Sequence, residues 1–427
     1  MNSQISFCRR IGQLLSGLLV ILTIACVDPD DMLLRGTVDV IVVDGNITNL
    51  AEPQFIKLNR SRADPLTGRF GVLAVTKATV KVVVDSLQVI TCRETVAGTY
   101  QLPSDFKGQV GHAYQAQITL SNGVQYISTQ QIMPSVPPID KLTVQFNATS
   151  LPLGLYSNRF QAGYDCIVST QDPPGQRNYY RWDWNLWEKQ KWCRTCYRGI
   201  YIDSVQTAYR QPNGTYVYTR QAVEDCVPPA SLPNGDFWND YLCRSQCWDI
   251  FQNYTLSIFD DKLTSGGLLN HRNVAQVPLF TRVPALLEIR QVALTAEAYR
   301  FYQLLQQQTQ NTGGIADTPP TAIVGNMTNP ANPRERVVGL FTASAIAPVR
   351  HWLDKKDATA IALGAYDDLR QIVQDEDELY YVENTRTPKL GPDGPSFTPG
   401  GTSRFITAPC IPSDSRTPNK PEGWQDR

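Results

Sequence analysis

The stretch "NYYRWDWNLWEKQKW", residues 178–192, decides the fold class of this chain. Apolar and polar side chains alternate along it. The apolar set is Tyr180, Trp182, Trp184 and Leu186, and the polar set between them is Arg181, Asp183 and Asn185. A period of two places one set on each face of a β-strand. The sequence therefore predicts a core strand of a β-sandwich, with Trp182 and Trp184 buried.

Two further tryptophans of this stretch, Trp187 and Trp192, follow the point where the alternation is expected to slip. An aromatic binding platform is the alternative interpretation of a strand so rich in tryptophan. We favour core packing for Trp182 and Trp184, and we keep Trp187 and Trp192 as candidate ligand-binding residues at the surface.

Upstream, residues 38–135 consist of short β-branched stretches separated by turn sequences. The segment "LSNGVQYIS" predicts a hairpin, because Asn122-Gly123 supplies the positive φ angles of a tight turn. Roughly five or six short strands in a region of this length indicate a small β-sandwich. The prolines of "MPSVPPID" lack the N–H that a strand ladder requires, so we place a domain boundary between residues 135 and 136.

Downstream, residues 136–427 predict a larger β-rich domain. A second hairpin is expected at Asn213-Gly214. Helices are expected near 295–310, where Thr295 can serve as the N-cap, and near 358–374. After Pro388 the chain is rich in proline and glycine, which predicts a long irregular C-terminal tail. The predicted fold class is mainly β, with two β-sandwich-like (immunoglobulin-like) domains, the second larger and carrying one or two helices.

At the N-terminus, Arg9 and Arg10 precede an apolar run that ends at Cys26, and acidic residues follow at once. The run is shorter than the roughly 20 apolar residues of a membrane-spanning helix, and its layout is typical of a secretory signal. Because "LTIAC" resembles a lipobox, we predict a lipoprotein signal peptide over 1–25, lipidation of Cys26 and a tether over 26–37. An ordinary signal peptide with a chance cysteine is the alternative.

The cysteines after Cys26 are the one set of residues in the sequence that indicates specific chemistry, either disulfides or a metal site. They are Cys92, Cys166, Cys193, Cys196, Cys226, Cys243, Cys247 and Cys410. An even number in an exported chain favours disulfides, although eight cysteines permit 105 pairings. The spacing of the pairs 193/196 and 243/247 also resembles a four-thiolate zinc site. Since exported thiols tend to be oxidised and zinc needs thiolates, we favour disulfides and expect no metal.

The rest of the sequence carries few signs of catalysis. Lys plus Arg is 39 and Asp plus Glu is 40, a balance that gives no electrostatic footprint for nucleic acid. The three histidines have no metal-binding spacing, and no nucleophile elbow or nucleotide-binding loop is found. We therefore expect no cofactor and no enzymatic activity. Carboxylates from distant strands could still assemble a hydrolase, and the sequence leaves that alternative open.

Several segments resemble one family in the order in which they occur. They are "VVDGNITN" (42–49), "YYRWDW" (179–184), "CW" (247–248), the long stretch 291–329, "VVGLFTASAI" (337–346), and a tail with Cys410 and Trp424. The chain resembles the domain of unknown function 4249 family, exported lipoproteins of Bacteroidota. The resemblance implies an outer-membrane lipoprotein, often encoded near a TonB-dependent receptor, and it supplies no catalytic residues. It also implies an export role for Asp28, Asp30 and Asp31, because acids just after the lipidated cysteine resemble a signal for export to the outer leaflet.

From these observations we expect a lipid-anchored protein of the outer membrane, exposed at the cell surface. It is expected to bind a ligand or partner and to act as an accessory to a TonB-dependent receptor or transporter. The alternatives are an extracellular hydrolase with unrecognised carboxylates and a structural or adhesive surface protein.

Overall fold

The computed structural model describes residues 40–63, 70–152, 161–228, 238–253, 255–264, 266–309, 323, 325–358, 396–397, 403–404 and 406–426. The predicted signal peptide, Cys26 and the tether lie outside the described residues. So does the second predicted helix after Ala358, where only the 3-10 turn η3 (Lys356–Ala358) is described. In the part of the chain that is described, no helix has both the length and the apolar character needed to cross a membrane.

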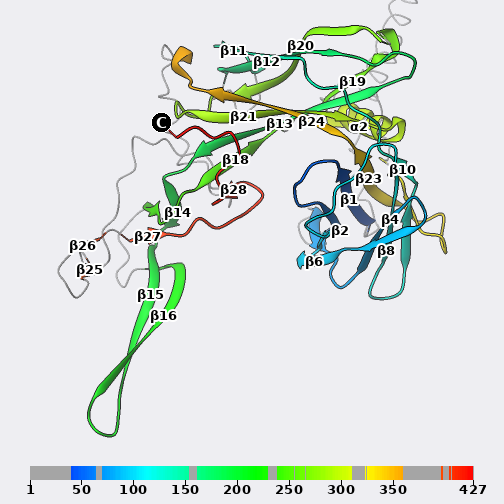
Figure 1. Ribbon diagram of the computed structural model, residues 1–427. Helices are drawn as coiled ribbons and strands as arrows, with labels where there is room; N and C mark the ends of the chain where they lie inside the picture. The colour runs from blue at the N-terminus through cyan, green and yellow to red at the C-terminus, as the bar shows by residue number, and fades with distance from the viewer. Residues whose placement is uncertain are drawn as a thin grey trace, which may run out of the picture.

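The chain is mainly β, as predicted, and two β-sandwich-like domains form its body (Figure 1). The first sandwich packs two six-stranded sheets around one core. One sheet has the order β23-β1-β2-β7-β6, with β3 paired to β2, and the other has the order β22-β9-β8-β4-β5, with β10 paired to β8. The strands in sequence order are β1 (Val40–Thr48), β2 (Phe55–Ala63), β3 (Phe70–Ala74), β4 (Thr79–Val84), β5 (Gln88–Thr91), β6 (Arg93–Val96), β7 (Thr99–Gln101), β8 (Ala113–Thr119), β9 (Gln125–Ser128), β10 (Gln131–Ile132), β22 (Met327–Thr328) and β23 (Val337–Ser344).

The hairpin predicted at Asn122-Gly123 is confirmed. Strands β8 and β9 pair antiparallel on either side of it, and Gly123 has a φ of 85°. The Asn122 side chain accepts a hydrogen bond from the Val124 amide at 3.1 Å, which stabilises the turn locally.

Two strands from far along the chain complete the first sandwich. Strand β23 runs parallel to β1, and β22 pairs with β9. Gly339 of β23 lies opposite Val43, and a Cβ on it would lie 1.9 Å from the Val43 carbonyl oxygen, so only glycine allows this approach. The predicted first domain, 38–135, is therefore incomplete, because 327–344 belong to the same core. The prolines near residue 135 mark where the chain leaves the first sandwich. They do not indicate that residues 327–344 return to it.

The second sandwich is built around the stretch that opened the sequence analysis. Its sheets have the orders β11-β12-β20 and β24-β21-β13-β18-β28, with β19 also paired to β13. The strands are β11 (Lys141–Asn147), β12 (Gly163–Gln171), β13 (Tyr179–Lys189), β18 (Trp248–Gln252), β19 (Ser257–Asp260), β20 (Leu268–Pro278), β21 (Ala285–Ala293), β24 (Ile346–Leu353) and β28 (Arg416–Thr417), with the 3-10 turn η2 (Asp261–Leu263) after β19. Trp182 and Trp184 are buried in its core, as predicted.

A single α-helix among the described residues packs where the two sandwiches meet. Helix α2 (Ala296–Thr309) confirms the predicted helix near 295–310. Thr295 is its N-cap, because its hydroxyl accepts a hydrogen bond from the Ala298 amide at 3.2 Å. Ala298 is buried in a cluster with Val292 of the second sandwich and Leu340 of the first. The helix thus contributes apolar contacts to the junction.

The remaining strands form a small unit beside the second sandwich. Strands β14 (Trp192–Tyr197), β17 (Trp238–Cys243) and β27 (Thr407–Ala408) make a three-stranded sheet. Strands β15 (Ile200–Arg210) and β16 (Tyr216–Val227) form a long hairpin, and β25 (Ser396–Phe397) pairs with β26 (Ser403–Arg404). The β15–β16 hairpin extends far from both sandwiches (Figure 1). We call it the arm.

Candidate binding surfaces

Three disulfides surround the base of the arm. They are Cys193–Cys243, Cys196–Cys226 and Cys247–Cys410, with Cα separations of 4.6, 5.6 and 5.6 Å. The prediction of disulfides is confirmed for these six cysteines. The sulfurs of Cys193, Cys247 and Cys410 lie within 4.8 Å of one another, but each is bonded to a cysteine partner and so is no thiolate for zinc.

The prediction is wrong for Cys92 and Cys166, which are free. Cys92 packs in the core of the first sandwich and Cys166 in that of the second, so the two thiols cannot meet. Burial raises the pKa of Cys92 to about 12. Burial and the nearby Asp165 also raise the pKa of Cys166 well above the ordinary thiol value. Both cysteines act as small apolar core residues and are poor nucleophiles.

The disulfides support a satellite core that holds the arm. Cys193, Cys196, Tyr201 and Tyr241 are buried together there. The Tyr241 hydroxyl accepts a hydrogen bond from the Tyr201 amide at 2.9 Å, and the two rings are 5.3 Å apart. Because Cys226 is in β16, its bond to Cys196 ties the returning strand of the arm to this core. The base of the arm is therefore fixed by covalent and polar contacts.

Beyond its base the arm is exposed on both faces. Tyr209, Tyr216 and Tyr218 retain 54%, 58% and 63% of their accessible surface. Arg210 lies opposite Tyr216 and Ala208 lies opposite Tyr218, so Arg210, Tyr216 and Tyr218 share one face. The Arg210 side chain makes no hydrogen bond or ion pair with another described residue. Tyrosine and arginine are among the residues enriched in the hot spots of protein interfaces.

The edges of the arm are open as well. Among the described strands, β15 and β16 pair only with each other. An isolated two-stranded hairpin is marginally stable in water, and natural proteins usually protect such long unpaired edges. The arm therefore offers a partner both main-chain hydrogen-bonding groups and large exposed side chains.

The two surface tryptophan candidates are corrected by the structure. The alternation of β13 does not slip after Leu186, because Glu188 is still buried in register. Trp187 is consequently half-buried on the face opposite the core. Trp192 begins β14 and is buried, with 8% of its surface accessible. Neither residue forms an exposed aromatic platform. The arm instead carries three exposed aromatic residues, Tyr209, Tyr216 and Tyr218.

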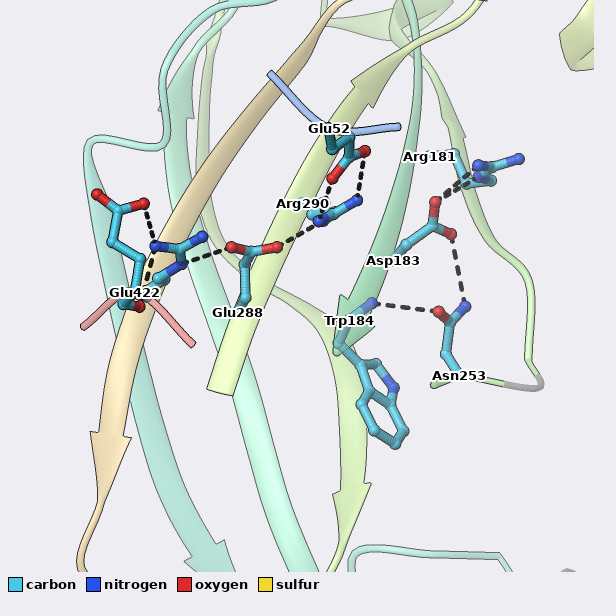
Figure 2. Close-up of polar contacts among 9 residues, drawn as sticks. Glu52, Arg181, Asp183, Trp184, Asn253, Glu288, Arg290 and Glu422 are labelled. Atoms are coloured by element: carbon cyan, nitrogen blue, oxygen red, sulfur yellow. Dashed lines mark hydrogen bonds and ion pairs between the residues drawn. The ribbon is translucent and has the colours of Figure 1, made fainter. Parts of the chain in front are cut away.

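A ladder of charged side chains crosses the junction between the sandwiches (Figure 2). Glu52, in the β1–β2 connection, accepts two hydrogen bonds from Arg290 of β21 at 3.0 and 2.9 Å. Arg290 also donates to Glu288 at 2.5 Å, and Arg350 of β24 donates to the other oxygen of Glu288 at 2.6 Å. Arg350 then reaches Glu422 of the C-terminal segment at 2.8 Å. The ladder links both sandwiches and the tail.

The charges of the ladder hold one another in the ionised state. Glu288 is buried, and an unpaired carboxylate there would be costly. Burial of Arg290 and Arg350 acts to lower the pKa of each guanidinium, but their carboxylate partners outweigh it and both pKa values are raised. Both arginines therefore remain cations. The polar contacts continue on β13, where Arg181 pairs with Asp183 at 2.7 Å (Figure 2).

A second group of carboxylates bears on the hydrolase alternative. Asp172 and Asp261 are both fully buried, and the Asn178 amide donates to each of them at 3.2 Å. Burial and the neighbouring Asp172 raise the pKa of Asp261. Acids that converge in this way are typical of active sites, but a substrate has no access to a pair without exposed surface. Through Asn178, which precedes β13, this pair connects η2 with the segment that follows β12.

Sequence reasoning located the hairpin but missed that it projects as an arm. The available signal was the composition of 204–221, where polar side chains occupy both faces and leave no core-facing set. No sequence pattern predicted the charged ladder, because Glu52 and Arg290 are separated by 238 positions.

These features define a disulfide-bonded, two-sandwich, mainly β protein with a projecting arm. The profile of the family described as a domain of unknown function (DUF4249) matches residues 28–349. The chain belongs to this family, which confirms the resemblance seen in its sequence. The curated proteins contain no match to the chain.

Proposed function

We propose that this protein is a lipid-anchored outer-membrane protein, exposed at the cell surface, that binds a protein partner through its arm. We propose further that the partner is a TonB-dependent receptor. The observation that carries the proposal is the arm itself, which is fixed at its base by a disulfide and exposed on both faces and both edges. The signal-like segment that ends at Cys26 supports the anchoring.

A protein partner suits the arm better than a small ligand. An added strand from a partner would pair with an open edge of β15 or β16 and satisfy its main-chain groups. The exposed tyrosines would then supply large, rigid contact area, and Arg210 would meet an acidic group. Binding by this mode needs no catalytic residue and no cofactor.

Replacing Tyr209, Tyr216 and Tyr218 by serine should abolish partner binding without unfolding the protein. Each tyrosine is exposed, so we expect each change to alter the free energy of unfolding by no more than about 0.5 kcal/mol. Recovery of a TonB-dependent receptor, identified by mass spectrometry after affinity purification from membranes, should fall at least about tenfold.

The matched control replaces Leu87 and Leu263 by serine. These side chains are also highly exposed but lie away from the arm, so receptor recovery should be unchanged. Equal recovery from the tyrosine variant and the wild type would contradict a binding role for the arm.

Cys26→Ser should prevent lipid labelling and release the protein from membranes, because the thiol that carries the lipid is removed. Incorporation of a labelled fatty acid and fractionation of the cells measure both effects. A Cys26→Ser protein that stays in the membrane fraction would exclude this anchor.

The companion variant replaces Asp28, Asp30 and Asp31 by alanine. It should stay lipidated but become hidden from external protease.

A further inference from the structure

Two of the three disulfides lie against each other in the satellite core. The sulfurs of Cys193, Cys247 and Cys410 lie within 4.8 Å of one another, although Cys193 is bonded to Cys243 and the other two are bonded together. A thiolate exchanges with a disulfide when its sulfur can reach one of the two bonded sulfurs. These two bonds are therefore placed to exchange partners once either of them is opened.

The four cysteines differ in how easily a reductant in solution can reach them. Cys247 has no accessible surface, and Cys193 and Cys410 retain only 4% and 7% of theirs. Cys243 is only partly buried, so its bond is the one that a small dithiol reaches first. Attack at Cys243 Sγ releases Cys193 as a thiolate, and this thiolate lies beside the Cys247–Cys410 bond.

Burial decides which sulfur of the second bond leaves. The leaving sulfur becomes a thiolate, and burial away from solvent disfavours that charge. Cys410 keeps a small exposed surface and Cys247 keeps none, so attack at Cys247 Sγ with departure of Cys410 is favoured. In the product Cys193 is bonded to Cys247, which ties β14 to the residue before β18.

We propose that Cys193 is a relay thiol that passes reduction from the accessible bond to the buried one and so unfastens the C-terminal segment. One thiol of a dithiol reductant bonds to Cys243 and displaces Cys193. Cys193 then bonds to Cys247 and displaces Cys410. The second thiol of the reductant displaces Cys243. The dithiol leaves as a disulfide, and its two protons pass to the new thiols of Cys243 and Cys410. This relay does not depend on the function proposed for the arm.

Departure of Cys410 leaves the chain that follows it attached to the body by non-covalent contacts alone. Lys57 of the first sandwich pairs with Asp414, and Arg350 of the second pairs with Glu422. Both carboxylates are about nine-tenths exposed, and ion pairs of this kind contribute little stability. Reduction therefore loosens a segment that contacts both sandwiches.

The test treats the purified full chain with dithiothreitol under native conditions and quenches samples at intervals with N-ethylmaleimide. Peptide mass spectrometry reports which cysteines are labelled and which are bonded. In the wild type, Cys243 and Cys410 should be labelled together while a new Cys193–Cys247 bond forms. In the double variant Cys193→Ala, Cys243→Ala, labelling of Cys410 should be at least about tenfold slower, because its bond is buried and the relay is gone.

The double variant Cys196→Ala, Cys226→Ala is the matched control. It removes a disulfide of the same satellite core but leaves the relay in place. Losing a disulfide loosens the core, which by itself speeds labelling, so the control should label Cys410 at the wild-type rate or faster. Slower labelling in the relay variant consequently cannot arise from a destabilised fold.

Two results would overturn the relay. One is labelling of Cys410 in the Cys193, Cys243 variant that is as fast as in the wild type, because dithiothreitol would then attack the buried bond directly. The other is a Cys193–Cys410 bond in the partly reduced wild type, because Cys247 would then be the sulfur that leaves.

Discussion

Replacing Cys247 and Cys410 together by alanine should lower the free energy of unfolding by about 2–5 kcal/mol. This bond joins residues 163 positions apart, and a long closed loop restricts the unfolded chain more than a short one. It also holds the C-terminal segment that carries Trp424, whose ring contacts those of Trp248 and Trp352 at 5.8 and 5.0 Å. Urea unfolding followed by tryptophan fluorescence measures the change.

Both cysteines must be removed at once for a clean result. A single replacement leaves a thiol in the cluster whose sulfurs lie within 4.8 Å, where it can attack the neighbouring Cys193–Cys243 bond. Cys92→Ala is the control, because that thiol is buried but takes no part in a disulfide. An unfolding midpoint that is the same for the double variant and the wild type would show that the bond contributes no stability.

Lys355→Met should lower the free energy of unfolding by about 3–5 kcal/mol, because it leaves a buried carboxylate without its cation. Lys355 Nζ contacts Glu188, and both side chains are almost fully buried. Lys355 also donates to the Thr281 carbonyl at 3.1 Å, and the Thr281 hydroxyl donates to Glu188 at 3.0 Å. The ion pair thus ties β13 to the segments that flank β21 and β24. Urea unfolding of the variant measures the loss.

The double variant Lys355→Met, Glu188→Leu separates the cost of an orphaned charge from the value of the pair. Buried ion pairs often exchange for apolar residues with little loss, so most of the stability should return. A double variant as unstable as Lys355→Met alone would show that Glu188 is not the group that Lys355 neutralises.

Two of the ion pairs join parts of the chain that are far apart in the sequence. The Glu52–Arg290 pair joins the two sandwiches, and Arg350–Glu422 joins the second sandwich to the tail.

What the sequence determined by itself was local. Alternation over 179–186 predicted the core strand with Trp182 and Trp184 inside, because side chains on a strand point to opposite faces in turn. Asn122-Gly123 and Asn213-Gly214 predicted two hairpins, since their backbones favour the required φ angles. Thr295 predicted the start of α2, because an N-cap hydroxyl can accept a hydrogen bond from the free amide three residues on. Each of these features depends on neighbours a few residues away.

Tertiary structure alone decided what depends on distant neighbours. The pairing of cysteines follows from which sulfurs the fold brings within bonding distance, so Cys92 and Cys166 stayed free although their count favoured bonds. Strand β23 joins β1 across almost 300 positions, which no local pattern encodes. Trp192 is buried at the start of β14, where burial does not alternate from one residue to the next. The exposure of the arm likewise follows from the absence of a second layer over 205–223 in the described structure, since strand-forming residues fold into a hairpin whether or not another sheet covers them.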